Sequence, residues 1–472
     1  MSKIIGREWE QRVLRDAVDS DKPEFIAVYG RRRIGKTFLV RNFFEGKFDF
    51  YMSGSFRAPM KDQLENFRIQ LETYSGKSWP KVTSWRDAFR QLQEYLSSLQ
   101  KDKIIVFIDE LPWLDTPRSR FISALELFWN GWADWNDKVK FIVCGSATTW
   151  MTHKLIGNKG GLHNRVTHQL YLAPFNLRDS ELLLKANGVE WTRHQIVECY
   201  MAVGGVPFYL SKMKKGLSLP QNIDHLFFHD KGELRQEYDT LFKSLFNDSE
   251  IYRHVVELLA SKAEGLTRRE IRTELNLNEG GKLTEVLTNL KTCDFIREYM
   301  AFGRKKKGNL FQLTDLYTLF YLKHVKDSGN GSENYWSTRI DSPAHRSWAG
   351  YAFEQVCLHH TYQIKEALGI SGIQTSIYSW TDEEKGRKKA QIDLVIDRRD
   401  EVINLCEIKF SLGAYAITPA YMETMLTRKE QFRETTGTRK ALHLTMITMD
   451  GVLHNPQWNM IQNEVTADAL FK

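Results

Sequence analysis

The segment from Gly30 to Thr37 constrains the fold of this chain more than any other. An apolar run, residues 25–29, comes directly before it, and residues 38–40 continue as an apolar segment. The segment reads Gly30-Arg31-Arg32-Arg33-Ile34-Gly35-Lys36-Thr37 and fills the pattern G-x-x-x-x-G-K-[ST]. Between a buried strand and a helix, this pattern predicts a loop whose backbone N–H groups converge on one anion. The two glycines permit the tight turn that such a loop needs.

The side chains of this loop point to a nucleotide. Lys36 can reach the β- and γ-phosphates, and the Thr37 hydroxyl can ligate Mg²⁺. We therefore predict ATP and Mg²⁺ as cofactors. The alternative is a glycine loop that precedes a helix by chance. The residues expected to bind the nucleotide in the loop are Gly30, Arg31, Arg32, Arg33, Ile34, Gly35, Lys36, Thr37 and Phe38.

A second motif lies at the end of residues 103–110. This run of β-branched and aromatic residues predicts a central strand buried on both faces of a parallel sheet. Asp109 and Glu110 stand at its C-terminal end, where ligand sites of α/β sheets form. We expect Asp109 to bind nucleotide and Mg²⁺, and Glu110 to orient and deprotonate the attacking water.

Two further residues are candidates for the same site. Ser146 follows the predicted strand 139–144, and it is placed to contact the γ-phosphate or the lytic water. The alternative is a helix cap for residues 148–150. Arg165 follows a glycine-rich loop and is a candidate arginine finger, in cis or across a subunit boundary. The alternative for Arg165 is a surface charge.

The composition is that of a globular protein with room for several domains. The chain has 472 residues, a net charge of +7 and a pI near 8.9, which allow a polyanionic partner without requiring one. Five cysteines lie far apart without a C-x-x-C pair, which is typical of a reduced, cytoplasmic protein. Neither a signal peptide nor a run of membrane-spanning length is apparent, so no membrane association is expected.

Residues 246–326 have the order of a winged helix-turn-helix. Helical patterns at 249–260, around 267–271 and at 282–290 precede two strand-like segments joined by the basic turn 303–309. One interpretation places the helix 282–291 in a DNA major groove and the lysines of the turn on phosphates. The other is a module that joins two domains and carries a solvated turn.

A second set of chemically active residues lies near the C-terminus. Residues 391–397 and 402–409 read as a hairpin, so that Asp393 falls opposite Glu407, and Glu407 and Lys409 point to the same face. Glu354 lies in a predicted helix before the hairpin. Two carboxylates and an ammonium suit a Mg²⁺ site that activates water against a phosphodiester, with Asp393 and Glu407 as ligands. The alternative is an ordinary cross-strand charge pair on a solvated sheet.

The N-terminal motifs resemble those of the prokaryotic (archaeal-type) ATPase family, in the STAND branch of AAA-like P-loop NTPases. The resemblance covers about residues 1–245 and implies a P-loop NTPase parallel sheet over 1–178 and a helical lid over 179–245. It also implies nucleotide-controlled switching as much as continuous turnover, and it is compatible with a nucleotide-dependent homo-oligomer. The segments that carry it are residues 29–37, 108–114 and 144–147, Arg165 and Gly204-Gly205-Val206-Pro207.

The C-terminal set resembles the PD-(D/E)xK nuclease superfamily. The matching positions are Glu354, Asp393, Glu407 and Lys409, with Ile392 where the superfamily name has proline. The resemblance implies a restriction-endonuclease-like α/β domain over 335–472, in which Lys409 orients the nucleophile and Glu354 supports the site.

The sequence as a whole predicts a multidomain α/β protein. Our first hypothesis is an ATPase whose nucleotide state controls a metal-dependent nuclease acting on DNA or RNA. The second is a nucleotide-dependent switch or scaffold without nuclease activity. The third is a regulator that binds DNA through the winged helix.

Overall fold

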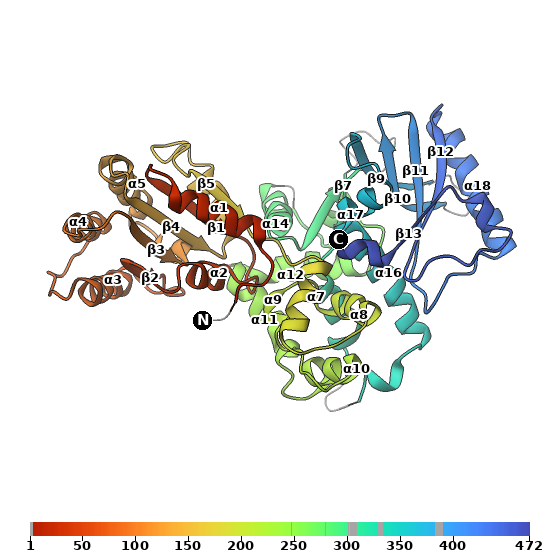
Figure 1. Ribbon diagram of the computed structural model, residues 1–472, viewed down its shortest axis with the longest axis horizontal. Helices are drawn as coiled ribbons and strands as arrows, with labels where there is room; N and C mark the ends of the chain where they lie inside the picture. Colours follow the sequence, from red (N-terminus) through yellow and green to blue (C-terminus); the bar gives the residue numbers. More distant parts are fainter. Residues whose placement is uncertain are drawn as a thin grey trace. The chain divides into compact units, whose positions relative to one another are not determined.

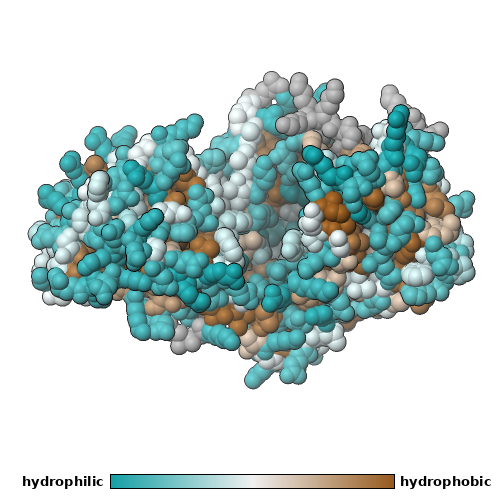
Figure 2. Space-filling model, turned by 45° about the horizontal axis from the view of Figure 1, so that its top comes forward, coloured by the Kyte–Doolittle hydropathy of each residue, from teal (hydrophilic) through white to brown (hydrophobic). Residues whose placement is uncertain are grey.

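The computed structural model describes residues 3–246, 248–278, 280–300, 302, 309–328, 334–382 and 390–472. The chain divides into two compact units, Met1–Ala173 and Pro174–Lys472, which Figure 1 colours from red to yellow and from yellow to blue. The surface drawn in Figure 2 is mainly hydrophilic with small, separate hydrophobic areas. No helix in the described part of the chain is long and apolar enough to cross a membrane.

The first unit is built on a five-stranded parallel sheet with the strand order β2-β3-β4-β1-β5. Its strands are β1 (Glu24–Tyr29), β2 (Phe50–Ser53), β3 (Ile104–Asp109), β4 (Val139–Gly145) and β5 (His168–Tyr171). Its longer helices are α1 (Glu8–Asp19), α2 (Lys36–Phe43), α3 (Met60–Ser75), α4 (Trp85–Ser97) and α5 (Phe121–Gly131). The strands predicted at 103–110 and 139–144 are confirmed.

Helices cover both faces of this sheet because every central strand is apolar on both sides. In β1, Phe25 and Ala27 pack with α3, α4 and α5, whereas Ile26 and Val28 pack with α1 and α2. Such two-sided burial is what makes a parallel strand a continuous apolar run. The carboxyl ends of β1, β3 and β4 lie at one edge of the sheet, which is where ligand sites of α/β sheets form.

The second unit begins with helices and continues into a small sheet. The helices are α7 (Leu177–Ala186), α8 (Arg193–Val203), α9 (Pro207–Leu210), α10 (Leu219–Ile223) and α11 (Glu233–Leu245). The next elements are α12 (Ser249–Ala260), β6 (Leu266–Thr267), α13 (Arg268–Glu274), α14 (Gly281–Thr292), β7 (Ile296–Tyr299) and β8 (Leu310–Leu313). The three strands pair in the order β6-β8-β7. The basic turn predicted at 303–309 lies almost wholly outside the described residues.

The C-terminal part holds a second five-stranded sheet with the order β13-β12-β11-β10-β9. Its elements are α16 (Pro343–His359), α17 (Thr361–Ala367), β9 (Thr375–Thr381), β10 (Gln391–Arg398), β11 (Val402–Lys409), α18 (Pro419–Thr436), β12 (Ala441–Thr448) and β13 (Asn463–Thr466). Strands β9, β10 and β11 are antiparallel, and β12 and β13 join them in parallel. Helix α18 packs on one face of this sheet, and the core that includes α16 covers the other.

Candidate functional site

The predicted loop lies between β1 and α2 and closes around its own lysine. Lys36 is buried, and its Nζ donates to the carbonyl oxygens of Gly30 at 3.0 Å and of Arg31 at 2.9 Å. Gly35 has a φ of +87°, a backbone conformation that favours glycine. The helix α2 begins at Lys36, so its N-terminus faces the concavity of the loop.

Position 30 requires glycine for two reasons: its backbone has a positive φ, and a larger side chain would collide with neighbouring atoms. Its φ is +143°, and a Cβ there would lie 2.4 Å from the Leu172 oxygen and 2.6 Å from Ile34 Cδ1. The Leu172 carbonyl belongs to backbone that pairs with β1, because the Leu172 N–H donates to the Tyr29 oxygen at 2.8 Å. The loop is thus packed directly on the segment that ends the first unit.

Substitution of Gly30 by alanine is expected to lower the stability of the N-terminal unit by about 1–3 kcal/mol, from backbone strain, and to weaken ATP binding. The matched control is Gly131→Ala, since Gly131 ends helix α5 and a Cβ there meets nothing within 4 Å. Thermal unfolding and titration with a fluorescent ATP analogue measure both effects. Wild-type stability and affinity in Gly30→Ala would contradict the packing argument.

Thr37 and Asp109 lie together at the carboxyl edge of the sheet. Thr37 Oγ1 donates to Asp109 Oδ2 at 2.8 Å, and the Glu110 N–H donates to Asp109 Oδ1 at 2.9 Å. Burial raises the pKa of Asp109 to about 6, against the lowering effect of the Thr37 hydrogen bond. A hydroxyl and a carboxylate are oxygen ligands of the kind that Mg²⁺ prefers, so these residues fit a cation beside the loop.

The buried Asp109 carboxylate makes the nucleotide-free protein sensitive to pH. Its folded pKa of about 6 lies above the ordinary value of 3.8, so its contribution favours folding at low pH and is lost as the pH rises through 6. At pH 8, the free energy of unfolding of Asp109→Asn is expected to exceed that of wild type by about 2–3 kcal/mol. Near pH 4 the two free energies should be equal. Denaturation of metal-free and nucleotide-free protein at both pH values tests this, and a gain that does not change with pH would contradict it.

Glu110 is held by Ser146 across the gap between β3 and β4. The Ser146 hydroxyl donates to Glu110 Oε1, and the Ser146 N–H donates to Oε2 at 3.2 Å. Glu110 adopts a φ of +47°, which is uncommon outside glycine and is often found at functional sites. Ala147, not Ser146, is the N-cap residue of helix α6 (Thr148–Trp150), and it makes no side-chain cap bond. The helix-cap interpretation of Ser146 is therefore wrong.

The strand order explains why these residues meet. Strand β4 lies between β1 and β3, so its tip at Ser146 falls between the loop and the Asp109–Glu110 pair. Sequence distance does not reveal this insertion. The predicted residues Lys36, Thr37, Asp109, Glu110 and Ser146 all lie at the carboxyl edge of the one sheet.

Arg165 lies at the amino-terminal edge of the sheet, opposite the carboxyl edge that carries the loop. The adjoining Thr167 N–H donates to the Phe25 oxygen at 2.9 Å, at the start of β1, and β5 runs parallel to β1 from there. Arg165 pairs with Asp134 at 2.9 Å. An arginine finger acting in cis is therefore wrong for this residue, because the length of β1 separates it from its own loop. A role across a subunit boundary stays a prediction.

The arginines inside the loop are not equivalent. Arg31 is 1% exposed, whereas Arg32 and Arg33 are partly exposed. Arg7, close to the N-terminus, donates to the Ala173 oxygen at 2.6 Å and pairs with Glu10 at 3.2 Å. The opening segment thus lies against the end of the first unit, on the same side as the loop.

In the C-terminal sheet the hairpin register is the predicted one. Leu394 pairs with Cys406, which sets Asp393 opposite Glu407 in the antiparallel pair β10–β11. The pairing of β10 with β9 shifts between Ile392 and Val395, so Asp393 lies in a β-bulge. Bulges next to active sites re-aim a side chain, and this one sits at the predicted ligand.

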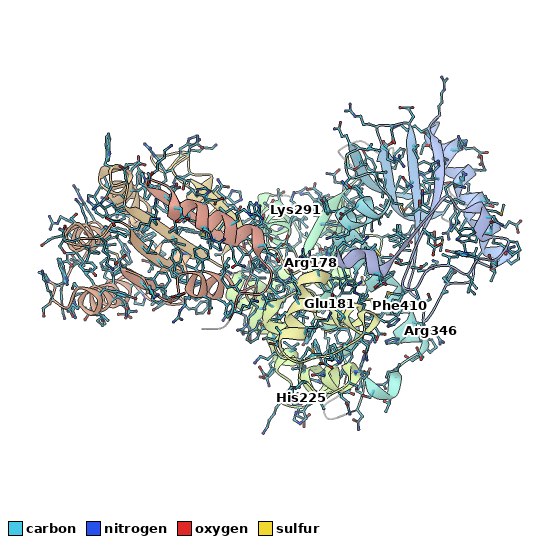
Figure 3. The ribbon with its side chains drawn as sticks, in the orientation of Figure 1. Arg178, Glu181, His225, Lys291, Arg346 and Phe410 are labelled. Atoms are coloured by element: carbon cyan, nitrogen blue, oxygen red, sulfur yellow. The ribbon has the colours of Figure 1, made fainter. Side chains whose placement is uncertain are left out.

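Glu407 is the most heavily bonded of the predicted residues. Its Oε1 lies 2.8 Å from Lys409 Nζ and accepts from the Tyr421 hydroxyl, and its Oε2 lies 3.1 Å from Arg428 Nη1. Phe410, labelled in Figure 3, packs its ring 5.7 Å from Phe353, the residue before Glu354. Among the described residues no cluster of three or more His, Cys, Asp and Glu side chains forms a ready-made metal cage.

The remaining carboxylates of this site hold protons more tightly than usual. Burial first, and the charge of Asp393 second, raise the pKa of Glu354 to about 9. Burial and the charge of Glu407 raise the pKa of Asp393 to about 7. Lys409, despite its burial, has a raised pKa because the Glu407 carboxylate lies beside it. A divalent cation at Asp393 would favour the ionised form of that carboxylate, because its charge would oppose the effect of burial.

Sequence reasoning missed Tyr421 and Arg428, which helix α18 brings to Glu407. Their spacing of about two helical turns places both side chains on one face of α18. This spacing was the feature of the sequence that could have identified them. It could not be used, because the segment after the hairpin gave no indication of which face meets the sheet.

Comparisons with known proteins bear on the N-terminal part. Residues 4–213 match a family model described as an ATPase domain predominantly from Archaea. The uncharacterized protein MJECL04 of Methanocaldococcus jannaschii is 28% identical over 412 residues, which is 86% of this chain and 87% of that protein. The N-terminal part of the chain is thus similar to an archaeal-type ATPase domain.

One of two similar solved structures supports this at the level of the fold. The Walker-type ATPase PABY2304 of Pyrococcus abyssi has a TM-score of 0.50 and 18% identity, over 68% of this chain and 96% of that one. The ORC2 protein of Aeropyrum pernix has a TM-score of 0.43 and 14% identity, over 72% of this chain and 96% of that one. The first likeness supports a P-loop NTPase-like parallel sheet with its helices.

Proposed function

We propose that this chain is an ATP-binding and ATP-hydrolysing protein whose nucleotide state controls a metal-dependent nuclease-like site acting on DNA or RNA. The observation that carries the proposal is the convergence of Glu354, Asp393, Glu407 and Lys409 on one site, in a chain that also has an ATPase domain. The two sites belong to different units of the chain.

The ATPase step follows from the edge of the first sheet. Thr37 and Asp109 would hold Mg²⁺, whose charge would offset that of the phosphates. Lys36 leaves its two carbonyl partners for the phosphates, and the loop amides and the N-terminus of α2 hold the remaining charge. Glu110, once released from Ser146, takes the proton of the attacking water. Ser146 is then free to bind the γ-phosphate or that water, and Arg165 could act only on the site of a second subunit.

The nuclease step is supported by the order of the C-terminal elements. Helix α16 carries Glu354, the meander β9-β10-β11 carries Asp393, Glu407 and Lys409, and α18 leads to the parallel strand β12. A helix with a glutamate before the hairpin, in an α/β domain, is compatible with the PD-(D/E)xK resemblance. A divalent cation at Asp393 and Glu407 would supply Lewis acidity and an activated water. Lys409 then orients the nucleophile, and Glu354 supports the site.

The winged helix-turn-helix interpretation is supported by the order α12, β6, α13, α14, β7, β8. The basic side chains of α14 are engaged, since Lys282 pairs with Asp248 at 3.5 Å and Lys291 with Glu298 at 2.7 Å. Lys291 is labelled in Figure 3. DNA contact through α14 would have to exchange these pairs for phosphates, so we rank a DNA-binding regulator third.

The second candidate function is a nucleotide-dependent switch without cleavage. Glu407 favours it, because both of its oxygens already have cationic or hydroxyl partners. Such a protein would bind ATP and change shape or assembly without cutting any strand.

One experiment separates these functions. Supercoiled plasmid and single-stranded DNA and RNA are incubated with wild type, Lys36→Ala and Lys409→Ala, in Mg²⁺ or Mn²⁺, with and without ATP. The proposal expects cutting that Lys409→Ala loses and Lys36→Ala alters. If wild type binds ATP but cuts no substrate under any of these conditions, the nuclease proposal is wrong and the nucleotide-dependent switch is the function that remains.

A further inference from the structure

Arg428 holds the oxygen of Glu407 that a cation would need. Oε1 of Glu407 is shared by Lys409 and Tyr421, whereas Oε2 has the Arg428 guanidinium as its partner at 3.1 Å. The Glu407 side chain is 8% exposed and that of Arg428 is 28% exposed. The carboxylate is therefore largely enclosed, whereas the side chain of its Oε2 partner Arg428 is partly exposed.

Two positive charges cannot share this carboxylate oxygen at low cost. A guanidinium does not lose its proton in proteins, so Arg428 cannot adapt to a neighbouring divalent cation by neutralising itself. In a partly buried site the repulsion between a cation and a guanidinium at contact distance is strong. One of the two has to leave Oε2.

This inference rests on the proposed function, in which Asp393 and Glu407 bind a divalent cation. We propose that Arg428 and the cation compete for Glu407 Oε2, and that cation binding turns the Arg428 guanidinium outward onto a phosphate of the nucleic-acid strand. In the metal-free site Arg428 thus binds Glu407, and in the metal-bound site it contacts the substrate.

The geometry of Arg428 suits both positions. It stands on helix α18, a rigid element packed on the sheet through Met422, Met425 and Phe432, while its long side chain is partly exposed. Its planar fork of donors matches phosphate as well as carboxylate. Exchange of an internal carboxylate for a phosphate would couple metal loading to strand binding.

Metal affinity distinguishes this role from a purely supporting one. If Arg428 only held Glu407 in place, its loss would weaken metal binding. If it competes, its loss strengthens metal binding. The direction of the change is therefore decisive.

The test counts Mn²⁺ bound to the full chain by electron paramagnetic resonance, in an Asp109→Asn background that removes the carboxylate of the N-terminal site. Arg428→Gln is expected to bind Mn²⁺ about tenfold more tightly than the parent, and Arg428→Lys to lie between them. The matched control is Arg433→Gln, on the same helix, because the ion pair of Arg433 among the described residues is with Glu430 of its own helix, at 3.7 Å. Equal or weaker Mn²⁺ binding by a folded Arg428→Gln, or by Arg428→Lys if the first does not fold, overturns the proposal.

The substrate half is measured with Ca²⁺ in place of Mn²⁺, by the affinity for a fluorescent oligonucleotide. At saturating Ca²⁺, Arg428→Gln is expected to bind the strand several-fold more weakly than Arg433→Gln. Equal affinities overturn the phosphate contact. Failure of the underlying function has a different signature: Mn²⁺ binding that is absent, or that persists in Asp393→Asn, shows that this site takes no cation and overturns both statements.

Discussion

Replacing Glu110 by glutamine is expected to lower the rate of ATP hydrolysis by at least about 100-fold and to leave ATP affinity within a few-fold of wild type. The reason is positional. Glu110 follows β3 directly after Asp109, and its carboxylate accepts hydrogen bonds from Ser146, so its loss removes the base and not the phosphate contacts. Glutamine keeps the size of the side chain and can still accept from the Ser146 hydroxyl.

Three companion variants make this result specific. Lys36→Ala should lose ATP binding itself, and Asp109→Asn should lose the Mg²⁺ dependence of binding. Ser146→Ala should bind ATP and hydrolyse it more slowly than wild type, because Glu110 loses its hydroxyl partner. The measurements are phosphate release and the affinity for a fluorescent ATP analogue. Hydrolysis by Glu110→Gln at the wild-type rate would contradict the assignment of the base.

Replacing Asp393 by asparagine is expected to reduce metal-dependent strand cleavage by about 1,000-fold or more, while ATP hydrolysis in the absence of nucleic acid is retained. Asp393 lies opposite Glu407 in a bulge of β10, so asparagine keeps the shape and removes the anionic ligand. The burial that raises the pKa of Asp393 to about 7 also means that wild-type cleavage should fall as the pH drops below 7, where the metal-free carboxyl is protonated.

The matched control is Asp400→Asn, at the turn that joins β10 to β11. Asp400 pairs with Arg398 at the other end of the same hairpin, so its loss perturbs the strands without touching the site. Cleavage of nicked and supercoiled plasmid by both variants is compared at pH 6, 7 and 8. Equal activity of Asp393→Asn and Asp400→Asn would show that this carboxylate does not bind a catalytic metal.

The local pattern was enough to predict most of the site residues and their elements. Glycine, lysine and threonine at fixed spacing define a loop whatever surrounds it, and Phe25–Tyr29 could only be a buried strand. The hairpin of β10 and β11 was likewise readable, because the period of two and the short turn at Arg399–Asp400 set its register.

What the sequence could not supply is proximity between distant segments. The insertion of β4 between β1 and β3, which brings Ser146 to Glu110, depends on the order of strands in the sheet. The place of Arg165 at the far edge depends on the direction of β5. The contact of α18 with Glu407 depends on how a helix packs on the sheet, and neither spacing nor composition specifies that.

Strand β7 of the second unit places a charge near the C-terminal site. Arg297 of β7 donates to Gln312 of β8 at 2.7 Å, and its charge acts on Glu354 of α16. Through Arg297, the strand pair β7–β8 thus contributes to the electrostatic surroundings of Glu354.

The most direct measurement of the central claim is the cleavage rate of the Glu110→Gln variant with and without ATP, beside Lys36→Ala and Lys409→Ala, in Mn²⁺ on one plasmid substrate. Glu110→Gln should bind ATP without hydrolysing it. Its rate of plasmid cleavage should therefore change when ATP is added and should then remain constant. Lys36→Ala should cut at one rate with or without ATP, and Lys409→Ala should not cut. Cleavage by Glu110→Gln that ignores ATP it has bound would contradict nucleotide control of the C-terminal site.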